Sequence, residues 1–236
     1  FFGLTPWMDL NIIPQFFINS THGKTSGGFG DFSVGLDFQL YSSTFPFWFP
    51  GIKFAVQEIF PTGVFQNFHP HLLGTDQTGA GTFGTVLQLV LYKIYQLADS
   101  YFMSLNISGT YQVNTPVEVH GYNAYGGGKG TKGRVVVGNS FECIISFEFT
   151  LNQNWVFAMD NVYTHTDASS FYGTPGTING SPASVGLPSS EQFSFAPAIE
   201  YNFSANLGLI GGCWFSAAGR NSTRFASGVI EFVYVY

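Results

Sequence analysis

The stretch that decides the fold closes the chain: Gly228-Val229-Ile230-Glu231-Phe232-Val233-Tyr234-Val235-Tyr236. Large apolar or aromatic side chains occupy every second position, Ile230, Phe232, Tyr234 and Tyr236, and residues two apart share one face of a strand. A soluble protein would leave this row exposed. In a bacterial outer-membrane barrel such a row faces lipid, and the last strand pairs with the first. The stretch therefore predicts a transmembrane β-barrel in the outer membrane of a Gram-negative cell envelope.

The composition points in the same direction. Of 236 residues, 9% are charged and 18% are aromatic, whereas soluble domains carry about 25% charged residues. A membrane helix needs roughly 20 consecutive apolar residues. The most apolar run, residues 86–98, is interrupted by Gln88, Lys93 and Gln96. High hydrophobicity without a helical span indicates an all-β protein that keeps its polar side chains inside.

The net charge limits which partners are expected, and the first residues indicate how the chain is processed. The formal net charge is −6 with no basic cluster, which argues against a nucleic-acid partner. We expect outer-membrane lipid, lipopolysaccharide and a small organic solute as partners, and no cofactor. No secretory signal peptide begins at Phe1, so we expect a processed or truncated chain that lacks an N-terminal segment. The oligomeric state is not indicated.

Strict alternation recurs along the chain. In residues 31–41 the apolar set is Phe32, Val34, Leu36, Phe38 and Leu40, and polar or small side chains occupy most of the positions between them. A helix would repeat its apolar positions at three and four instead. Strands of about 9–11 residues are long enough to cross a bilayer when tilted.

About ten such strands are predicted within one domain, residues 1–236. Their ranges are 7–19, 31–42, 51–60, 82–93, 101–114, 134–150, 155–165, 191–202, 207–218 and 225–236. Short connections alternate with long ones, as in an up-and-down antiparallel barrel with short periplasmic turns and long extracellular loops. Because such barrels have an even strand count and both ends in the periplasm, we expect about twelve strands in the intact protein. Closure with ten is the alternative.

Four short motifs occur in order along the chain: Gly3-Leu4-Thr5, Gly28-Phe29-Gly30-Asp31, Pro61-Thr62-Gly63 and Leu151-Asn152-Gln153-Asn154-Trp155. With these motifs the sequence resembles the FadL-type outer-membrane channel superfamily, and within it the family of MetA-pathway phenol-degradation proteins. The resemblance implies a barrel that passes small, often hydrophobic, organic molecules. The plug-forming N-terminal region of long-chain fatty acid transporters is not seen, and no binding residue of the family maps onto this chain.

Charged residues within the strands are predicted to line the lumen, because a charge facing mid-bilayer lipid costs about 2–4 kcal/mol in the worst cases. An acidic lumen would favour cations or polar cargo. Alternatively, the acids pair with the two basic residues and with amides to fill a narrow barrel. The predicted lumen-lining set is Asp9, Asp37, Lys53, Arg134, Glu142, Glu148, Asp160, Glu200 and Glu231.

His69 and His71, which lie close together in a long predicted loop, are candidates for a metal site. Zinc sites need three or four ligands with supporting geometry, and Asp76 is the nearest carboxylate. We predict no metal site.

An enzyme was considered at His165, which lies near Asp167, Ser169 and Ser170. A nucleophile and its base must converge, but these residue types are common in any polar loop. No protease or lipase motif is visible, and we predict that the protein is not an enzyme.

The leading functional prediction is a passive channel for small hydrophobic or amphipathic organic molecules. Phe65, Phe68, Leu72 and Leu73 in the loop after Pro61-Thr62-Gly63 are candidates for an apolar substrate inlet. The alternative role for these four side chains is packing of the loop over the barrel mouth. The alternative function is a structural or surface-interaction barrel with a filled lumen and partner-binding extracellular loops.

Overall fold

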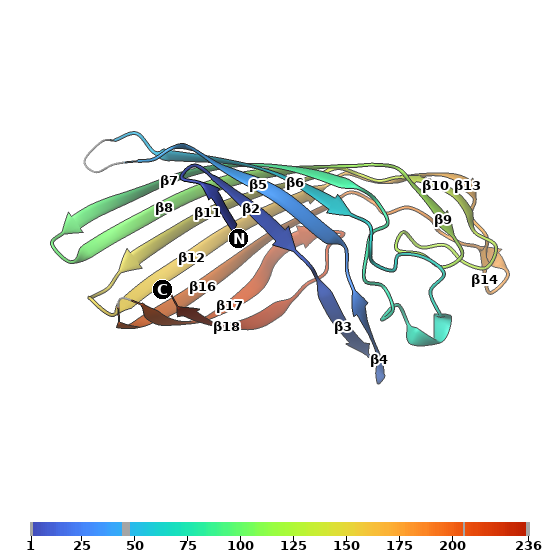
Figure 1. The fold of residues 1–236 in the computed structure, drawn as a ribbon. Helices are drawn as coiled ribbons and strands as arrows, with labels where there is room; N and C mark the ends of the chain where they lie inside the picture. The colour runs from blue at the N-terminus through green and yellow to red at the C-terminus, as the bar shows by residue number, and fades with distance from the viewer. Residues whose placement is uncertain (1, 44–47, 205, 235–236) are drawn as a thin grey trace.

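The computed structural model describes residues 2–43, 48–204 and 206–234, so that Val235 and Tyr236 of the closing stretch lie outside it. Its main feature is an antiparallel sheet of eleven strands in the order β1-β2-β5-β6-β7-β8-β11-β12-β16-β17-β18, which follows the chain (Figure 1). The strands are β1 (Phe2–Thr5), β2 (Met8–Ile13), β5 (Phe32–Tyr41), β6 (Gly51–Phe60), β7 (Gly84–Ala98), β8 (Tyr101–Asn114), β11 (Ser140–Thr150), β12 (Trp155–Thr166), β16 (Ser190–Ser204), β17 (Leu207–Arg220) and β18 (Ala226–Tyr234).

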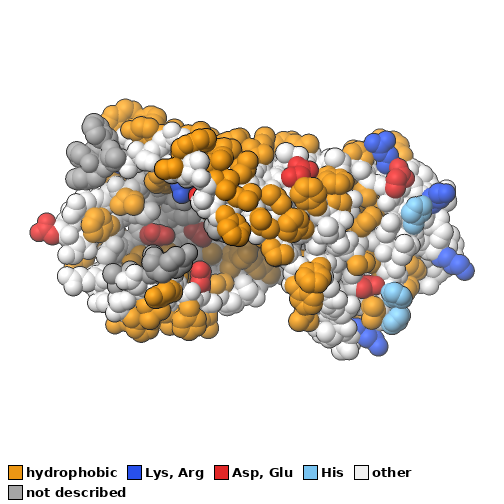
Figure 2. Space-filling model, in the orientation of Figure 1, with side chains coloured by type: hydrophobic (Ala, Val, Ile, Leu, Met, Phe, Trp, Pro, Cys, Tyr) orange, Lys and Arg blue, Asp and Glu red, His pale blue; other side chains and the backbone are white. Residues whose placement is uncertain are grey.

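The alternation in the sequence separates the two faces of this sheet. Directly paired residues lie on the same face of neighbouring strands. One row across five strands is Leu36, Val56, Leu87, Tyr111 and Phe141, and the next is Asp37, Ala55, Gln88, Thr110 and Glu142. The apolar face is exposed, as a face in contact with lipid must be, and apolar side chains cover the outside of the sheet (Figure 2). The predicted all-β antiparallel fold is confirmed.

Short and long connections lie at opposite ends of the sheet (Figure 1). The turn between β7 and β8 has two residues, Asp99 and Ser100, and the turn between β11 and β12 has four, 151–154. At the other end the connections are long, and several contain secondary structure. No helix among the described residues is long and apolar enough to cross a membrane.

The long connections form a cap at the loop end. It contains a three-stranded sheet, a helical turn and two further hairpins (Figure 1). Its small core consists of Val117, Val119, Tyr125 and Val135, against which Phe65 packs. The cap elements are β3 (Phe16–Thr21), β4 (Lys24–Phe29), η1 (Pro70–Leu72), β9 (Val117–His120), β10 (Lys132–Val136), β13 (Ser170–Thr174), β14 (Thr177–Ile178) and β15 (Ser181–Pro182).

Three expectations about the strands are corrected. The sheet has eleven strands instead of ten, because Phe2–Thr5 pairs with β2. The predicted strand 7–19 is two strands, since Pro14 lacks the N–H that a ladder requires and the chain leaves the sheet there. The predicted strand 134–150 is also two strands, β10 and β11, which belong to different sheets.

The two edges of the described sheet are β1 and β18. The start of β2 pairs with the end of β5, and the end of β18 pairs with the start of β17. Both edge strands therefore run toward the short-turn end, and a direct pair between them would be parallel. The total of twelve strands stays a prediction.

Candidate functional site

The inner face of the large sheet collects eight of the nine residues predicted to line a lumen. Asp9 and Asp37 pair directly, and their row continues through Ala55, Gln88 and Thr110 to Glu142. Residues an even number of positions apart on a strand share a face, and directly paired residues do so across strands. Followed in this way, the pairings place the other five on this face: Lys53, Glu148, Asp160, Glu200 and Glu231. Whether this face lines an open lumen stays a prediction.

Arg134 is the exception. It lies on β10, pairs with Glu118 of β9 and Tyr172 of β13 in the cap sheet, and is exposed. The chain leaves the large sheet because residues 137–139 separate β10 from β11. Gly138 lies so close to the backbone of Asp167 that an added Cβ would sit 2.0 Å from its carbonyl oxygen. Arg134 therefore belongs to the cap sheet and does not join the other eight.

A cavity of about 300 Å³ lies on the inner face between β2 and β7. Its polar lining consists of Asp9, Asp37, Gln39, Lys53 and Gln88. The Lys53 ammonium lies 5.5 Å from the centre of the Tyr92 ring, a cation–π contact. Figure 2 shows acidic side chains inside a hollow at the short-turn end of the sheet. This cavity is the best-defined candidate for a solute site.

A second acidic group surrounds β12 near the short turns. Glu148 of β11 pairs with Ala158 of β12, and Asp160 lies two residues further along β12. Glu200 pairs with Val156 on the other side of β12, and its row continues through Ile210 to Glu231. Four predicted lumen acids are thus brought to one part of the inner face.

The loop end holds two further cavities, of about 180 Å³ and 530 Å³, that share Gln15, Asp31 and Ala80 in their linings. Asp31 accepts hydrogen bonds from the backbone N–H groups of Gly63, at 2.9 Å, and Ala80, at 2.8 Å. The Tyr125 hydroxyl donates to the Ala80 carbonyl at 2.8 Å. Asp31 and Tyr125 therefore fix the loop 61–83 over the end of the sheet.

The environment of Tyr125 is unfavourable to its phenolate. Only 5% of the residue is exposed, in the cap core. Burial, followed by the nearby charge of Asp31, raises the pKa of Tyr125 to about 12. The phenol therefore stays protonated and keeps its hydrogen bond to Ala80 over the whole physiological range.

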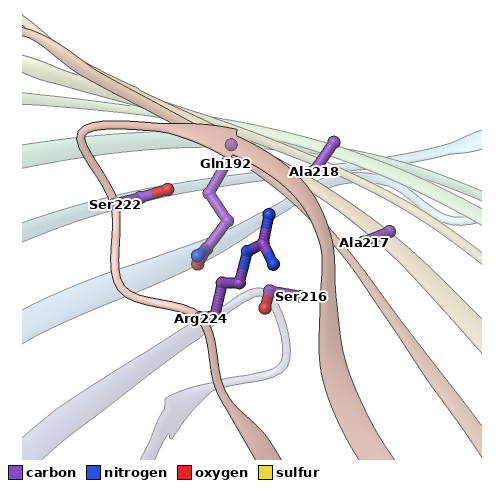
Figure 3. Close-up of a pocket in the computed structure, with 7 residues that line it drawn as sticks. Gln192, Ser216, Ala217, Ala218, Ser222 and Arg224 are labelled. Atoms are coloured by element: carbon purple, nitrogen blue, oxygen red, sulfur yellow. The ribbon is translucent and has the colours of Figure 1, made fainter.

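Arg224 is a cation near the inner face that sequence reasoning missed. It lies in the connection between β17 and β18 and lines a small cavity of about 40 Å³ with Gln192, Ser216 and Ser222. Figure 3 shows its side chain pointing between Gln192 and Ser216, both of which lie on the inner face. Gln192 also donates to the Thr223 carbonyl at 2.7 Å. No periodic signal could have found Arg224, because it lies in a loop.

The four inlet candidates lie apart from the cavities described above. Phe65 packs against the cap core, and its ring fills the space beside Gly81. Phe68 and Leu72 are half-buried, and Leu73 is exposed by 55%. The structure thus gives Phe65 a packing contact and leaves Leu73 free to meet a solute.

The histidines make local contacts. His69 Nδ1 lies 3.3 Å from Asp76 Oδ2, and no group of three metal-ligating side chains occurs among the residues that the structure describes. His165 Nε2 lies 3.3 Å from Asp167. The Ser169 hydroxyl accepts from the Leu187 N–H at 2.6 Å instead of meeting His165. The geometry lends no support to a nucleophile–base pair.

An antiparallel up-and-down sheet with a polar inner face and an apolar outer face is typical of transmembrane β-barrels. Among solved structures, the chain is similar to an outer membrane channel from Pseudomonas putida F1. The TM-score is 0.58 at 13% sequence identity, over 98% of this chain and 76% of that chain. This likeness shows the fold alone. No protein-family model matches the sequence, and no curated protein does. The resemblance to the FadL-type superfamily and the MetA-pathway family stays a prediction.

Proposed function

We propose that this protein is an outer-membrane channel for the passive uptake of small organic molecules. The observation that carries the proposal is the cavity of about 300 Å³ on the polar inner face, behind an exposed apolar outer face. Pockets for small molecules begin at about this volume. On this proposal, membrane lipid and lipopolysaccharide contact the outer face, and the protein lies in the bacterial outer membrane.

The proposed route begins among the extracellular loops. The cavities of about 530 Å³ and 180 Å³ meet at Gln15, Asp31 and Ala80. The inner of the two is also lined by Gln57 and Gln112, which lie on the inner face. A solute would pass these polar groups before it reaches the cavity beside Asp37.

The proposed cargo is amphipathic. Polar and aliphatic side chains are mixed on the inner face: one row consists of Gln39, Lys53, Val90, Ser108, Ile144 and Val162. Such a surface can contact an apolar ring and a polar substituent of one solute. Leu73 and its half-buried neighbours Phe68 and Leu72 would form the first apolar contact, with Phe65 holding the loop in place.

Solute flux into liposomes tests this proposal. Swelling rates are compared for glucose and phenyl glucoside, which differ by one apolar ring. We expect phenyl glucoside to enter at least as fast as glucose despite its larger size. Entry of glucose alone would indicate a general pore. If neither solute enters, the interpretation that remains is a barrel whose lumen is filled.

The alternative, a surface-interaction barrel, is favoured by one observation: the cap has a core of its own. Val119 and Val135 are fully buried within it. Loops that serve only as a rim need no such core. If flux is absent, binding of an envelope component to the cap becomes the better proposal.

A further inference from the structure

We propose that the cavity beside Asp9 and Asp37 is a recognition site for the protonated amine of a small organic cation. The inference rests on the proposed channel function, because it names the cargo class for the same inner face. It is carried by three features of the site: the uncovered pair of carboxylates, a surplus of hydrogen-bond acceptors, and a basic residue engaged elsewhere.

The two carboxylates face one another on adjacent strands. Asp9 of β2 pairs directly with Asp37 of β5, and like charges in such positions repel. Their row continues through Gly3 on one side and Ala55 on the other. A Cβ at Gly3 would lie 3.6 Å from an oxygen of Asp9. Gly3 and Ala55, two of the smallest residues, therefore flank the pair in its row, and neither has a side chain long enough to cover the carboxylates.

Asn11 holds one of the two carboxylates in place. It is only 9% exposed and lies two residues from Asp9 on the same face of β2. Its Nδ2 donates to Asp37 Oδ2, which directs the amide toward the carboxylates. Its Oδ1 is buried and has no hydrogen-bond partner among the described residues. A buried acceptor without a donor costs free energy, but Asn11 is not among the residues that line the cavity, so this oxygen lies beside the site and not in it.

The neighbouring amides also offer acceptors. Gln39 Nε2 donates to the carbonyl oxygens of Tyr41, at 2.6 Å, and Ile52, at 3.2 Å. Gln88 Nε2 donates to the Thr110 hydroxyl at 3.2 Å. Both side chains line the cavity; Gln39 directs two hydrogen bonds to the protein and Gln88 directs one. What remains for a solute is mainly oxygen, which suits a group with several N–H donors.

Lys53 does not neutralise the pair. It lines the same cavity, but no ion pair joins it to Asp9 or Asp37 among the described residues, and its ammonium lies by the Tyr92 ring at 5.5 Å. The lining therefore carries two negative charges against one positive charge. An ammonium placed between the carboxylates would be attracted by both negative charges. It would donate charge-assisted hydrogen bonds to both, and these are the strongest hydrogen bonds available.

The test measures binding directly, without flux. Benzylamine, which is protonated at pH 7, and neutral benzyl alcohol are titrated into the full chain folded in detergent, with ligand-observed saturation-transfer NMR as the readout. We expect benzylamine to bind about tenfold more tightly than benzyl alcohol. D9N/D37N should remove about that factor, since it removes both charges.

The matched control is E200Q/E231Q, which removes two carboxylates from the second acidic group on the same face. We expect it to change benzylamine affinity by less than about twofold, because neither Glu200 nor Glu231 lines the cavity beside Asp9 and Asp37. D9N/D37N should also unfold at no lower denaturant concentration than the parent, since it relieves a like-charge repulsion. The single variants D9N and D37N provide a folded comparison if the double variant fails to fold.

Two results would overturn the site: equal affinity for benzylamine and benzyl alcohol, or equal loss of benzylamine affinity in the two double variants. These results are distinct from failure of the channel. A protein that binds benzylamine at Asp9 and Asp37 but passes no solute keeps the site and loses the channel. A conducting protein with no preference for benzylamine keeps the channel and loses the site.

Discussion

Gln88 and Leu89 are neighbours on β7 that face opposite sides of the sheet: Gln88 lines the inner cavity, and Leu89 is 47% exposed on the outer face. Each pairs with residues of its own face on the two neighbouring strands. Gln88 lies beside Ala55 and Thr110, whereas Leu89 lies beside Phe54 and Gly109. Two consecutive residues of one strand thus face the polar inner side and the apolar outer side of the sheet.

This pair predicts a sharp difference between two lysine substitutions. L89K should destabilise the protein in bilayers by about 2–4 kcal/mol, because it places a charge against lipid in the central part of a strand. Q88K should be tolerated, since its ammonium would face the polar cavity that Asp37 and Asp9 also line. Urea unfolding in vesicles measures both, and equal tolerance of the two would contradict the assignment of faces.

Asp31 predicts the stability of the loop end. D31A removes the acceptors of the Gly63 and Ala80 N–H groups. Each hydrogen bond to a charged group contributes about 1.5–3 kcal/mol, so the loop 61–83 should open readily and be cleaved faster by protease. D167A removes an exposed carboxylate of the cap and should leave the cleavage rate near that of the parent.

The inlet prediction now separates two kinds of apolar residue. L73S should slow the uptake of phenyl glucoside while leaving glucose unchanged, because Leu73 is exposed in the loop. F65S should destabilise the cap, since Phe65 packs on its core. Comparable uptake of phenyl glucoside by L73S and the parent would remove the loop from the route.

Tyr125 predicts an alkaline transition of the cap. Its pKa of about 12 exceeds the value near 10 for an unfolded tyrosine, first through burial and then through Asp31. A raised pKa contributes stability that is complete below about pH 10 and is lost as pH rises toward about 12. Protease cleavage of the cap should accelerate in that window. Y125F should show a weaker pH dependence there, and an identical profile would contradict the account.

The sequence predicts the large sheet well where the pattern is local. The bounds 51–60 and 101–114 agree with β6 and β8, because period-two alternation is visible in the residues of the strand itself. The sequence also shows Pro14, and its missing N–H explains why the predicted strand 7–19 is divided into β2 and β3. The exposed face and the inner face of each strand follow from the same alternation.

The cap and part of the site could not be predicted, because long-range contacts decide them. Arg134 lies in the cap because β10 pairs with β9 and β13 instead of the large sheet, a pairing that no alternation reveals. Asp31 bonds Ala80, which lies 49 positions away. Asn11 shares the alternation of Asp9, and only the geometry shows that its Oδ1 is buried without a partner among the described residues.

Single-channel conductance of the folded chain in a planar bilayer tests the central claim most directly. We predict discrete current steps, with a reversal potential in a salt gradient that indicates cation preference. D9N/D37N should reduce this preference, and E118Q, which removes an exposed cap carboxylate, should not. A well-inserted protein that gives no current steps would contradict the channel, and anion preference would contradict the acidic lumen.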